Sequence, residues 1–444
     1  MAPEKERQRK FGFIGLEPGV NPIHMWVLVY AAFVSIALAI FDAFGTPYVL
    51  SESIGVPLEK QGNVVGRLNV YTEIVLLMVF TPFGVLSDRI GRRAIYAGGF
   101  ICLGISYALF PLAGSVSELA LIRVIYSLGL AGVTGMLATV IADYVIPEHR
   151  GRMVGMTGLL NGLGIVVSAL FLAKLPSVFV GQGYDNYTAG QYTLFIVAGL
   201  CGLSALIVGR GLKSGAPATV GERPGARESY KAAFTAARDN PQLAVAYASA
   251  FVARGDLVIV GTFLVLWGKV AAVEGGMETA AALEAGRIPF VIAQAAALIG
   301  AVVAVFVIDR FHRMSALAGC MGLAAVAYTM LLFVDDPLDK ANIPFFVLLG
   351  FGQIAAFLGS TTLIGKEAPA NNRGAVVGAF SVAGAMGILI MSGVGGSIFD
   401  SIDPRAPFIL LGLMNLVVML SAIYVRIKSP PLAAFHRVLR STSV

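Results

Sequence analysis

Ionisable side chains stand inside long apolar runs of this sequence. They are two aspartates, one glutamate and two arginines: Asp42, Glu73, Arg123, Arg254 and Asp256. Charged groups in the hydrocarbon core of a bilayer are costly, and those that occur usually face a water-filled cavity or an opposite charge. A carboxyl group in such a place can also change its charge by binding a proton. We therefore expect these residues to bind a solute or to carry a coupling proton.

The surroundings of these residues suggest how they are arranged. Asp42 precedes Gly45 and Pro47, which weaken a helix and can free backbone carbonyls toward a cavity. Arg254 and Asp256 are two positions apart, which is about 200° around a helix. Both can face one cavity only if the glycine between them distorts the turn.

One hypothesis pairs Arg254 with Asp42 or Glu73 across a central cavity and turns Asp256 toward a neighbouring helix. Two alternatives stay open. Asp42 can be satisfied by a neighbouring helix and serve packing alone, and Glu73 can belong to a static ion pair.

The composition sets the kind of fold that must hold these charges. The chain has 444 residues, of which 57% are hydrophobic and 13% charged, and its mean hydropathy is +0.81. One membrane crossing needs about 20 apolar residues. Such runs recur with short polar breaks and predict an all-α membrane protein with twelve transmembrane helices. We expect them near residues 25–50, 62–86, 94–113, 118–142, 153–175, 191–210, 242–268, 287–308, 315–334, 343–365, 375–398 and 407–426.

The positive charges predict an orientation. Of the 32 Lys and Arg residues, 23 fall on one side of these twelve helices, the side that also carries both termini. Positive loops stay in the cytoplasm, so we expect both termini in the cytoplasm of a protein of the bacterial inner (plasma) membrane. The net charge of +6 is then explained by these loops, and no nucleic-acid partner is expected. The opposite side holds only Lys60, Lys174, Lys269, Arg287, Lys340 and Arg405.

The longest hydrophilic stretch, residues 211–241, divides the chain into two groups of six helices. It predicts a cytoplasmic basic tail at 1–24, bundles at 25–210 and 242–426 joined by a linker, and a second tail at 427–444. In the first tail, Phe11, Phe13 and Ile14 are expected to lie along the membrane surface or to belong to a disordered segment.

Three short segments recur in order at almost one spacing. Asn21-Pro22 returns as Asn240-Pro241, the Asp-Arg pair that begins at residue 88 returns at residue 309, and the Arg-Gly pair at residue 150 returns at residue 373. In each case the second copy follows roughly 220 positions after the first, which predicts that one six-helix unit is duplicated.

The segment from Gly84 to Arg93, between the second and third helices, reads GVLSDRIGRR. It resembles the signature loop of the major facilitator superfamily at every main position. The resemblance implies two pseudo-symmetric six-helix bundles that move about a site near the midplane. It also implies that Asp88 faces the positive end of a helix in the other bundle while the cytoplasmic side is closed.

The resemblance extends to the rest of a gate on the cytoplasmic side. Gly84 and Gly91 permit close helix approach and a tight turn, and the cations anchor the loop at anionic lipid. The expected members in the first half are Gly84, Asp88, Arg89, Gly91, Arg92, Arg93, Asp143, Glu148 and Arg150. A degenerate copy in the second half consists of Asp309, Arg310, Arg313 and Arg373.

Two further positions resemble motifs of this superfamily. Arg123, followed by Gly129, resembles an Arg-x-x-x-x-x-Gly motif that lies near proton or substrate paths. The segment from Asp42 to Gly45 resembles the first helix of drug:proton antiporters.

These features predict a secondary active transporter that moves a small organic solute by alternating access with proton coupling, as an antiporter or a symporter. A lipid flippase on the same scaffold and a facilitated uniporter stay open as alternatives. The three cysteines and four histidines are scattered, so no metal, cofactor or enzymatic constellation is expected. The expected partners are the solute, the proton and membrane lipid, and we expect a monomer.

Overall fold

The computed structural model describes residues 10–215, 235, 237–308, 310–368 and 373–428. Within these ranges, twelve helical spans are long and apolar enough to cross a membrane, which confirms the predicted number. Several spans combine two helices. The first half contains α1 (Pro22–Ile40), α2 (Asp42–Glu52), α3 (Leu58–Ile90), α4 (Arg92–Leu109), α5 (Val116–Tyr144), α6 (Arg150–Val167), α7 (Leu175–Gly181) and α8 (Asn186–Gly211).

The second half contains α10 (Pro241–Val258), α11 (Leu264–Glu274), α12 (Thr279–Gly286), α13 (Ile288–Ile308), α14 (Arg313–Thr329), α15 (Ile343–Glu367), α16 (Arg373–Ser401) and α17 (Ala406–Lys428). Two widened π turns, η3 (Ser168–Leu172) and η4 (Ile259–Phe263), interrupt the fifth and seventh spans. Such turns often lie at functional positions in helices. Short 3-10 turns, η1 (Phe110–Leu112), η2 (Pro147–His149), η5 (Met330–Phe333) and η6 (Lys340–Asn342), stand at helix ends.

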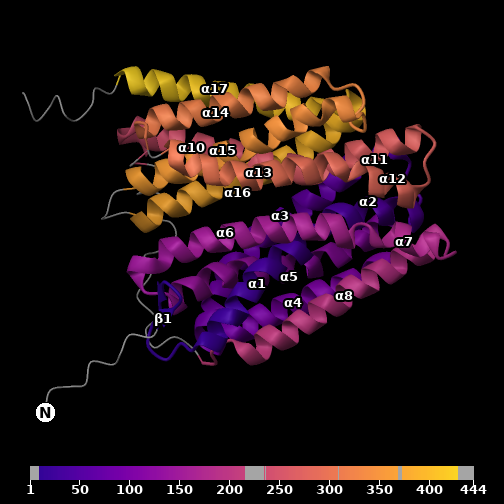
Figure 1. The fold of residues 1–444 in the computed structure, drawn as a ribbon, viewed down its shortest axis with the longest axis horizontal. Coiled ribbons are helices and arrows are strands. Elements are labelled where there is room, and N and C mark those ends of the chain that lie inside the picture. Colours follow the sequence, from indigo (N-terminus) through magenta and orange to yellow (C-terminus); the bar gives the residue numbers. More distant parts are fainter. Residues whose placement is uncertain (1–9, 216–234, 236, 309, 369–372, 429–444) are drawn as a thin grey trace, which may run out of the picture.

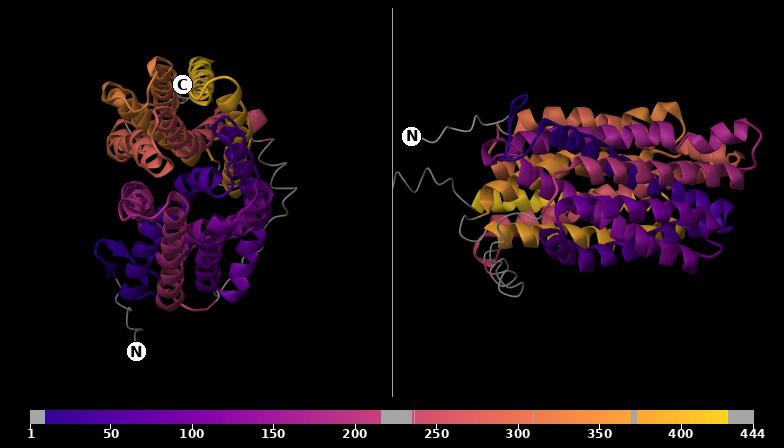
Figure 2. Two further views of the ribbon diagram at one scale, coloured as in Figure 1. Left: turned by 90° about the vertical axis from the view of Figure 1, so that its right-hand side faces the viewer. Right: turned by 90° about the horizontal axis from the view of Figure 1, so that it is seen from below.

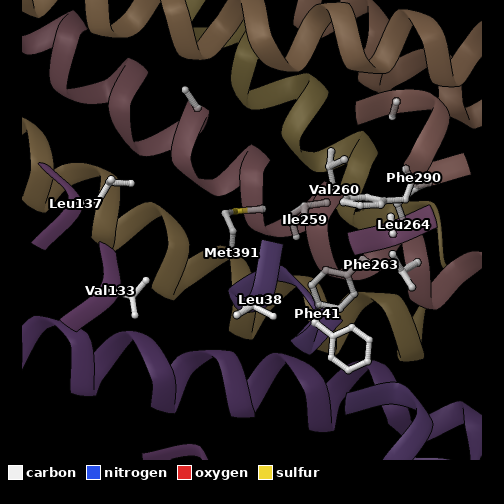
Figure 3. Packing of buried hydrophobic residues seen from close by; sticks show 14 of the residues in the cluster. Leu38, Phe41, Val133, Leu137, Ile259, Val260, Phe263, Leu264, Phe290 and Met391 are labelled. Carbon is white, nitrogen blue, oxygen red and sulfur yellow. The ribbon is translucent and has the colours of Figure 1, made fainter. Parts of the chain in front are cut away.

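The two halves form two bundles that lie side by side along one long axis (Figures 1 and 2). Their internal packing is alike. In the first half α4 packs against α5 and α8, and in the second half α14 packs against α15 and α17. Across the interface, α3 packs along α16. The buried apolar residues of both halves belong to one continuous cluster. Figure 3 shows part of it, with Leu38 and Phe41 of the first half and Ile259 and Phe263 of the second.

The two ends of the long axis carry different helix junctions, and we call them the basic end and the distal end. The basic end holds the α3–α4 junction at Gly91, the α5–α6 junction near Glu148, and the end of α17 at Lys428. The distal end holds the α2–α3, α11–α12 and α16–α17 junctions, which include Ser53, Gly275 and Asp403.

Glycines allow α3 and α16 to touch near the distal end. A Cβ atom added to Gly66 would collide with the carbonyl oxygen of Ser392, and one added to Gly396 would collide with that of Gly62. Backbones approach this closely only where side chains are absent.

The described part of the first tail folds against the basic end, so Ile14 does not lie on the membrane surface. β1 (Lys10–Phe11) and β2 (Ile14–Gly15) form a small antiparallel hairpin, and Ile14 is buried. The backbone N–H of Gly15 donates to His149 Nδ1 at 2.6 Å. The surface prediction is wrong for Ile14 because the α5–α6 junction offers backbone and imidazole partners to this segment. Phe13, in contrast, is exposed.

Candidate functional site

The first helix of the chain breaks where its carboxylate lies. α1 ends at Phe41 and Asp42 begins α2. The hydroxyl groups of Tyr107 and Tyr126 donate to the carbonyls of Leu38 and Ala39 at 2.6 and 2.8 Å. Backbone acceptors at this helix end are thus satisfied by side chains of α4 and α5.

Asp42 pairs with Arg123 of the same half. Thr46 Oγ1 donates to the Asp42 carboxylate at 2.7 Å, and the Arg123 guanidinium lies 5.2 Å from the ring centre of Tyr126. Arg123 is 1% exposed. The hypothesis that Asp42 pairs with Arg254 is therefore wrong, because Arg123 occupies the carboxylate from within its own bundle.

Glu73 lies on α3 of the first half, and Arg254 lies on α10 of the second half. They interact electrostatically, but no ion pair within 4 Å joins these two described residues. Glu73 is buried. The Arg254 side chain lies against Gly384 of α16, where an added Cβ would come within 2.7 Å of its Cγ, and its buried Nε has no hydrogen-bond partner in the structure. The static ion pair considered for Glu73 is not formed in this conformation.

Asp256 is fully buried in the second half. Its nearest donor is Asn415 Nδ2 of α17, 3.4 Å from each carboxylate oxygen. Asp256 thus faces a neighbouring helix, as its position on nearly the opposite side of α10 from Arg254 predicts.

At the basic end, the structure brings together the central residues of the predicted gate. Arg92 pairs with Asp88 and with Asp143, and its Nε lies 2.9 Å from Asp143 Oδ2. Gly91 has a φ of 94° between α3 and α4, a backbone conformation that side chains disfavour. The carbonyl of Gly84 accepts a hydrogen bond from Ser87 Oγ at 2.8 Å.

The other predicted gate residues of the first half lie farther out. Arg89 and Glu148 are exposed and Arg93 is half-buried. Arg150 Nη2 lies 3.9 Å from Glu17 in the tail segment, and its Nε donates to the carbonyl of Val145 at 2.9 Å.

In the second half, Arg313 Nε lies 2.6 Å from Glu367 Oε1. These residues follow Arg92 and Asp143 at nearly the repeat spacing. The ion pair of the first half therefore has a counterpart within the second half. Arg310 is exposed. Asp309 and the side chain of Arg373 lie outside the described residues.

A buried lysine joins the halves at the distal end. Lys269 of α11 is 0% exposed, and its ammonium donates to the carbonyl of Pro47 at 2.5 Å, to Ser51 Oγ at 2.6 Å and to Gln61 Oε1 at 3.0 Å. All three acceptors belong to the first half, and all are uncharged. Nearby, Arg287 Nη1 donates to the carbonyl of Ala169 at 3.0 Å.

A carboxylate adds a further contact between the halves at the distal end. Asp400, near the end of α16, accepts hydrogen bonds from the backbone N–H groups of Gly62 and Asn63 at 2.9 and 2.6 Å. These groups lie near the positively polarised N-terminal end of α3. The distal end is therefore closed by contacts between the halves.

Among the residues that the structure describes, no group of three or more His, Cys, Asp or Glu side chains could hold a metal ion.

The family model described as "Major Facilitator Superfamily" matches residues 27–385 and 277–441. The chain belongs to this superfamily. It is therefore a transmembrane transporter, and its twelve apolar helices make it an integral membrane protein.

Similar proteins and structures agree with this assignment. "Magnetosome protein MamH" of Paramagnetospirillum magneticum is 30% identical over 414 residues, which cover 90% of each chain. The nucleoside transporter NupG is similar in structure, with a TM-score of 0.66, 13% identity, and coverage of 91% of this chain and 99% of that chain. A bacterial homologue of the human lysosomal transporter Spinster, in an inward-facing and occupied conformation, has a TM-score of 0.64 and 16% identity, and the match covers 92% of this chain and 97% of that chain.

For some residues of this superfamily member, the sequence did not predict the contacts that the structure shows. The charge count places Lys269 and Arg287 on the outer side because they stand at the ends of apolar runs, yet both are buried between the halves. Glu367 lies 224 positions after Asp143, close to the repeat spacing, and this could have pointed to it. No comparable signal in the sequence identifies the acceptors of Lys269.

Proposed function

We propose that this protein is a secondary active transporter that moves a small organic solute by alternating access and couples this movement to protons. The observation that carries the proposal is the pair of opposite charges, Glu73 of the first half and Arg254 of the second, which interact electrostatically but form no ion pair with each other in the structure. Buried charges are retained where they have a partner or a task. A solute or a proton bound between these two groups would change their interaction as the halves move.

The distal contacts support the alternating-access part of the proposal. Lys269 and Asp400 each cross the interface and bind uncharged groups of the first half. An ammonium held by neutral oxygens is released at lower electrostatic cost than one held by a carboxylate. Asp88 near the end of α3 and Asp400 near the end of α16 stand at opposite ends of the interface. We propose that they stabilise closure at the basic and distal ends in turn.

The basic end corresponds to the cytoplasmic side in this proposal, because positive loops stay in the cytoplasm. Both termini are then cytoplasmic, and the conformation described is closed toward the outside. We propose the domain limits 1–24, 25–210, 211–241, 242–426 and 427–444 given above, an inner-membrane location and a monomeric state. Most of the linker lies outside the described residues.

The similarity to MamH supports a second location. That relative is named a magnetosome protein, so association with magnetosomes is an alternative to the inner membrane. Fractionating cells that express a tagged chain would separate these two locations.

The chemistry of the interface favours an anionic or zwitterionic solute. The Arg254 guanidinium retains an unused donor, and its planar fork binds carboxylate groups well. Glu73 would then accept an amino group of the solute or the coupling proton.

The test begins with compounds that raise the melting temperature of the purified protein. Their uptake is then measured in liposomes with and without a pH gradient. We expect Arg254→Ala to lower uptake at least about tenfold, which corresponds to about 1.4 kcal/mol, with unchanged expression. Glu73→Gln should lower the uptake of a zwitterionic solute more than that of an anion, because an uncharged amide no longer attracts the amino group of the solute.

The control is Arg210→Ala, which removes an arginine that is exposed and belongs to neither the gate nor the charge pair. Unchanged uptake and pH dependence in Arg254→Ala would remove the charge pair from the mechanism. Uptake by the wild-type protein that is the same without a gradient and moves no protons would make the protein a uniporter.

A further inference from the structure

The carboxyl group of Asp256 is enclosed by the second half. The residue is 0% exposed, as are Tyr328 of α14 and Asn415 of α17. Asn415 Nδ2 donates to the carbonyl of Leu411 at 2.9 Å and approaches both oxygens of Asp256 only to 3.4 Å. The Asp256 carboxyl therefore lacks a strong hydrogen-bond donor among the described residues.

Two polar atoms around this carboxyl lack hydrogen-bond partners in the structure. They are the hydroxyl oxygen of Tyr328, which interacts electrostatically with Asp256, and Oδ1 of Asn415. Buried polar atoms are usually satisfied, and an exception often marks a functional group or an absent ligand.

The charged groups on the surrounding helices do not compensate Asp256. On its own helix, Arg254 lies about 200° away and packs against Gly384 of α16. The other ionisable side chains described on the helices that pack around α10 are Arg313, Cys320 and Tyr328 on α14, Lys366 and Glu367 on α15, Asp400 on α16, and Tyr424, Arg426 and Lys428 on α17. Among the described residues, no ion pair reaches Asp256.

An isolated carboxylate in such a place is unfavourable. Removing an ion from water is costly even after the protein relaxes, and a group without a partner becomes neutral instead. A carboxylate becomes neutral by taking a proton from a hydronium ion, which leaves a carboxylic acid and water.

We propose that Asp256 carries the coupling proton of the transport cycle and holds it occluded between α10, α14 and α17 while the distal end is closed. The inference rests on the proposed proton-coupled transport and names the residue that binds the proton. Asp256 takes up the proton when the distal end is open and retains it through closure.

The helix next to Asp256 provides a way to open this site. The π turn η4 begins at Ile259, and the backbone N–H of that residue contacts the carbonyls of Gly255 and Asp256. Beyond η4, α11 carries Lys269, which is bound to the first half. When Lys269 leaves its acceptors, α11 bends at η4 and unpacks the helices over Asp256. Proton exchange is thereby linked to distal opening.

Infrared difference spectroscopy of the purified protein tests this assignment without knowledge of the solute. A protonated carboxyl group has a C=O stretching band separate from that of a carboxylate. We expect the wild-type protein to show such a band near neutral pH and to lose it as the pH rises. Asp256→Asn should lack this band, whereas Glu73→Gln, which removes the other buried acid near the interface, should retain it.

Tyr328→Phe provides a second variant that does not depend on the folding of Asp256→Asn. Removing the hydroxyl group beside Asp256 should shift the frequency of the band. An equal band in the wild-type protein and Asp256→Asn, or a band that Tyr328→Phe leaves in place, overturns the assignment. Loss of the band on adding sodium chloride at constant pH, with potassium chloride as control, also overturns it and identifies a sodium site.

The liposome assay separates this inference from the proposed function. If transport is proton-coupled but Asp256→Asn retains both the band and gradient-driven accumulation, only the present inference fails. If the wild-type protein shows the Asp256 band but transports without any proton movement, the proposed coupling fails, and only the protonation of Asp256 is retained from the present inference.

Discussion

The two halves differ in what surrounds the carboxylate inside their first span. In the first half, Asp42 stands at a helix break and is paired with Arg123. In the second half, Asp256 stands before a π turn and has no cation among its described contacts. The repeat spacing of roughly 220 positions places Tyr328 opposite Tyr107, and Phe346 opposite Arg123. The second half therefore has a tyrosine and a carboxylate but an apolar ring in place of the cation.

Charge pairs are not lost throughout the second half. The ion pair Arg92–Asp143 of the basic end is repeated as Arg313–Glu367. The difference is confined to the interior of the bundle, where an uncompensated charge costs most. This contrast suggests that the first carboxylate is a fixed structural ion and that the second changes its protonation.

The largest effect is expected from Arg123→Ala. It leaves Asp42, whose side chain is 13% exposed, without its buried partner, and breaking a buried pair costs up to about 3–5 kcal/mol. The measurement is the thermal or denaturant stability of the purified protein. The double variant Arg123→Ala/Asp42→Ala should recover much of the loss, since no charge is then left unpaired.

The matched change in the second half is Asp256→Asn. A neutral side chain of the same shape replaces a carboxyl group that is already neutral in our proposal, so we expect a change of at most about 1 kcal/mol. A loss as large as that of Arg123→Ala would show that both carboxylates are structural and would remove the contrast.

A smaller effect, on conformation, is expected from Lys269→Met. The second half does contain a buried cation in its first span, but this lysine binds oxygens of the first half. Without it, the population open at the distal end should grow about tenfold, which corresponds to about 1.4 kcal/mol. Distances between spin labels at Leu112 and Phe333, which are exposed at the distal ends of the two halves and lie away from the contact between α3 and α16, report on this opening.

The control for this variant is Lys174→Met. Lys174 also reaches the other half, 3.4 Å from Glu284, but it is about half exposed, and exposed ion pairs contribute little. Equal distance distributions in the two variants would refute a special role for the buried lysine.

The smallest effect is expected in the distal loops that precede the last helix of each half. Hydrogen bonds from Thr188 lower the pKa of Asp185, and hydrogen bonds from Arg405 lower the pKa of Asp403. A lowered carboxyl pKa in the folded state adds stability at neutral pH, and this stability is lost as the pH falls below about 4. Asp403→Ala should cost less than about 1 kcal/mol at neutral pH because the pair is partly exposed.

Melting curves from neutral to acid pH would check this last expectation. Asp185→Ala should have a smaller effect than Asp403→Ala, since Asp185 has no arginine partner among its described contacts. A difference between either variant and the wild-type protein that persists unchanged in acid would show that the carboxylate charge is not its cause.

The sequence predicted the features that depend on local composition. Hydropathy indicated twelve spans, and the turn at Gly91 and the role of Asp143 as a charge partner of the loop arginines followed from the resemblance of a short motif. The pairing of Asp88 with Arg92 did not follow from it, because the resemblance implies that Asp88 faces a helix of the other bundle. The partner of Asp42 could not be predicted, because Arg123 lies three spans later in the chain and helix packing decides which charges meet. The contacts of Lys269 could not be predicted for a related reason: charge counts sort residues by side of the membrane and carry no information on contacts between halves.

The glycine contact between α3 and α16 has a mechanical consequence. Gly66 and Gly396 hold the two backbones together close to one end of helices that continue toward the other. Ile90 lies about 36 Å beyond Gly66 along α3, at about 1.5 Å per residue. A rotation of about 10° at this fulcrum would move the far end by about 6 Å, enough to admit a small solute. The contact thus acts as a pivot close to the distal end. Small movements on its distal side, near Lys269 and Asp400, would become large displacements at Asp88 on the far side.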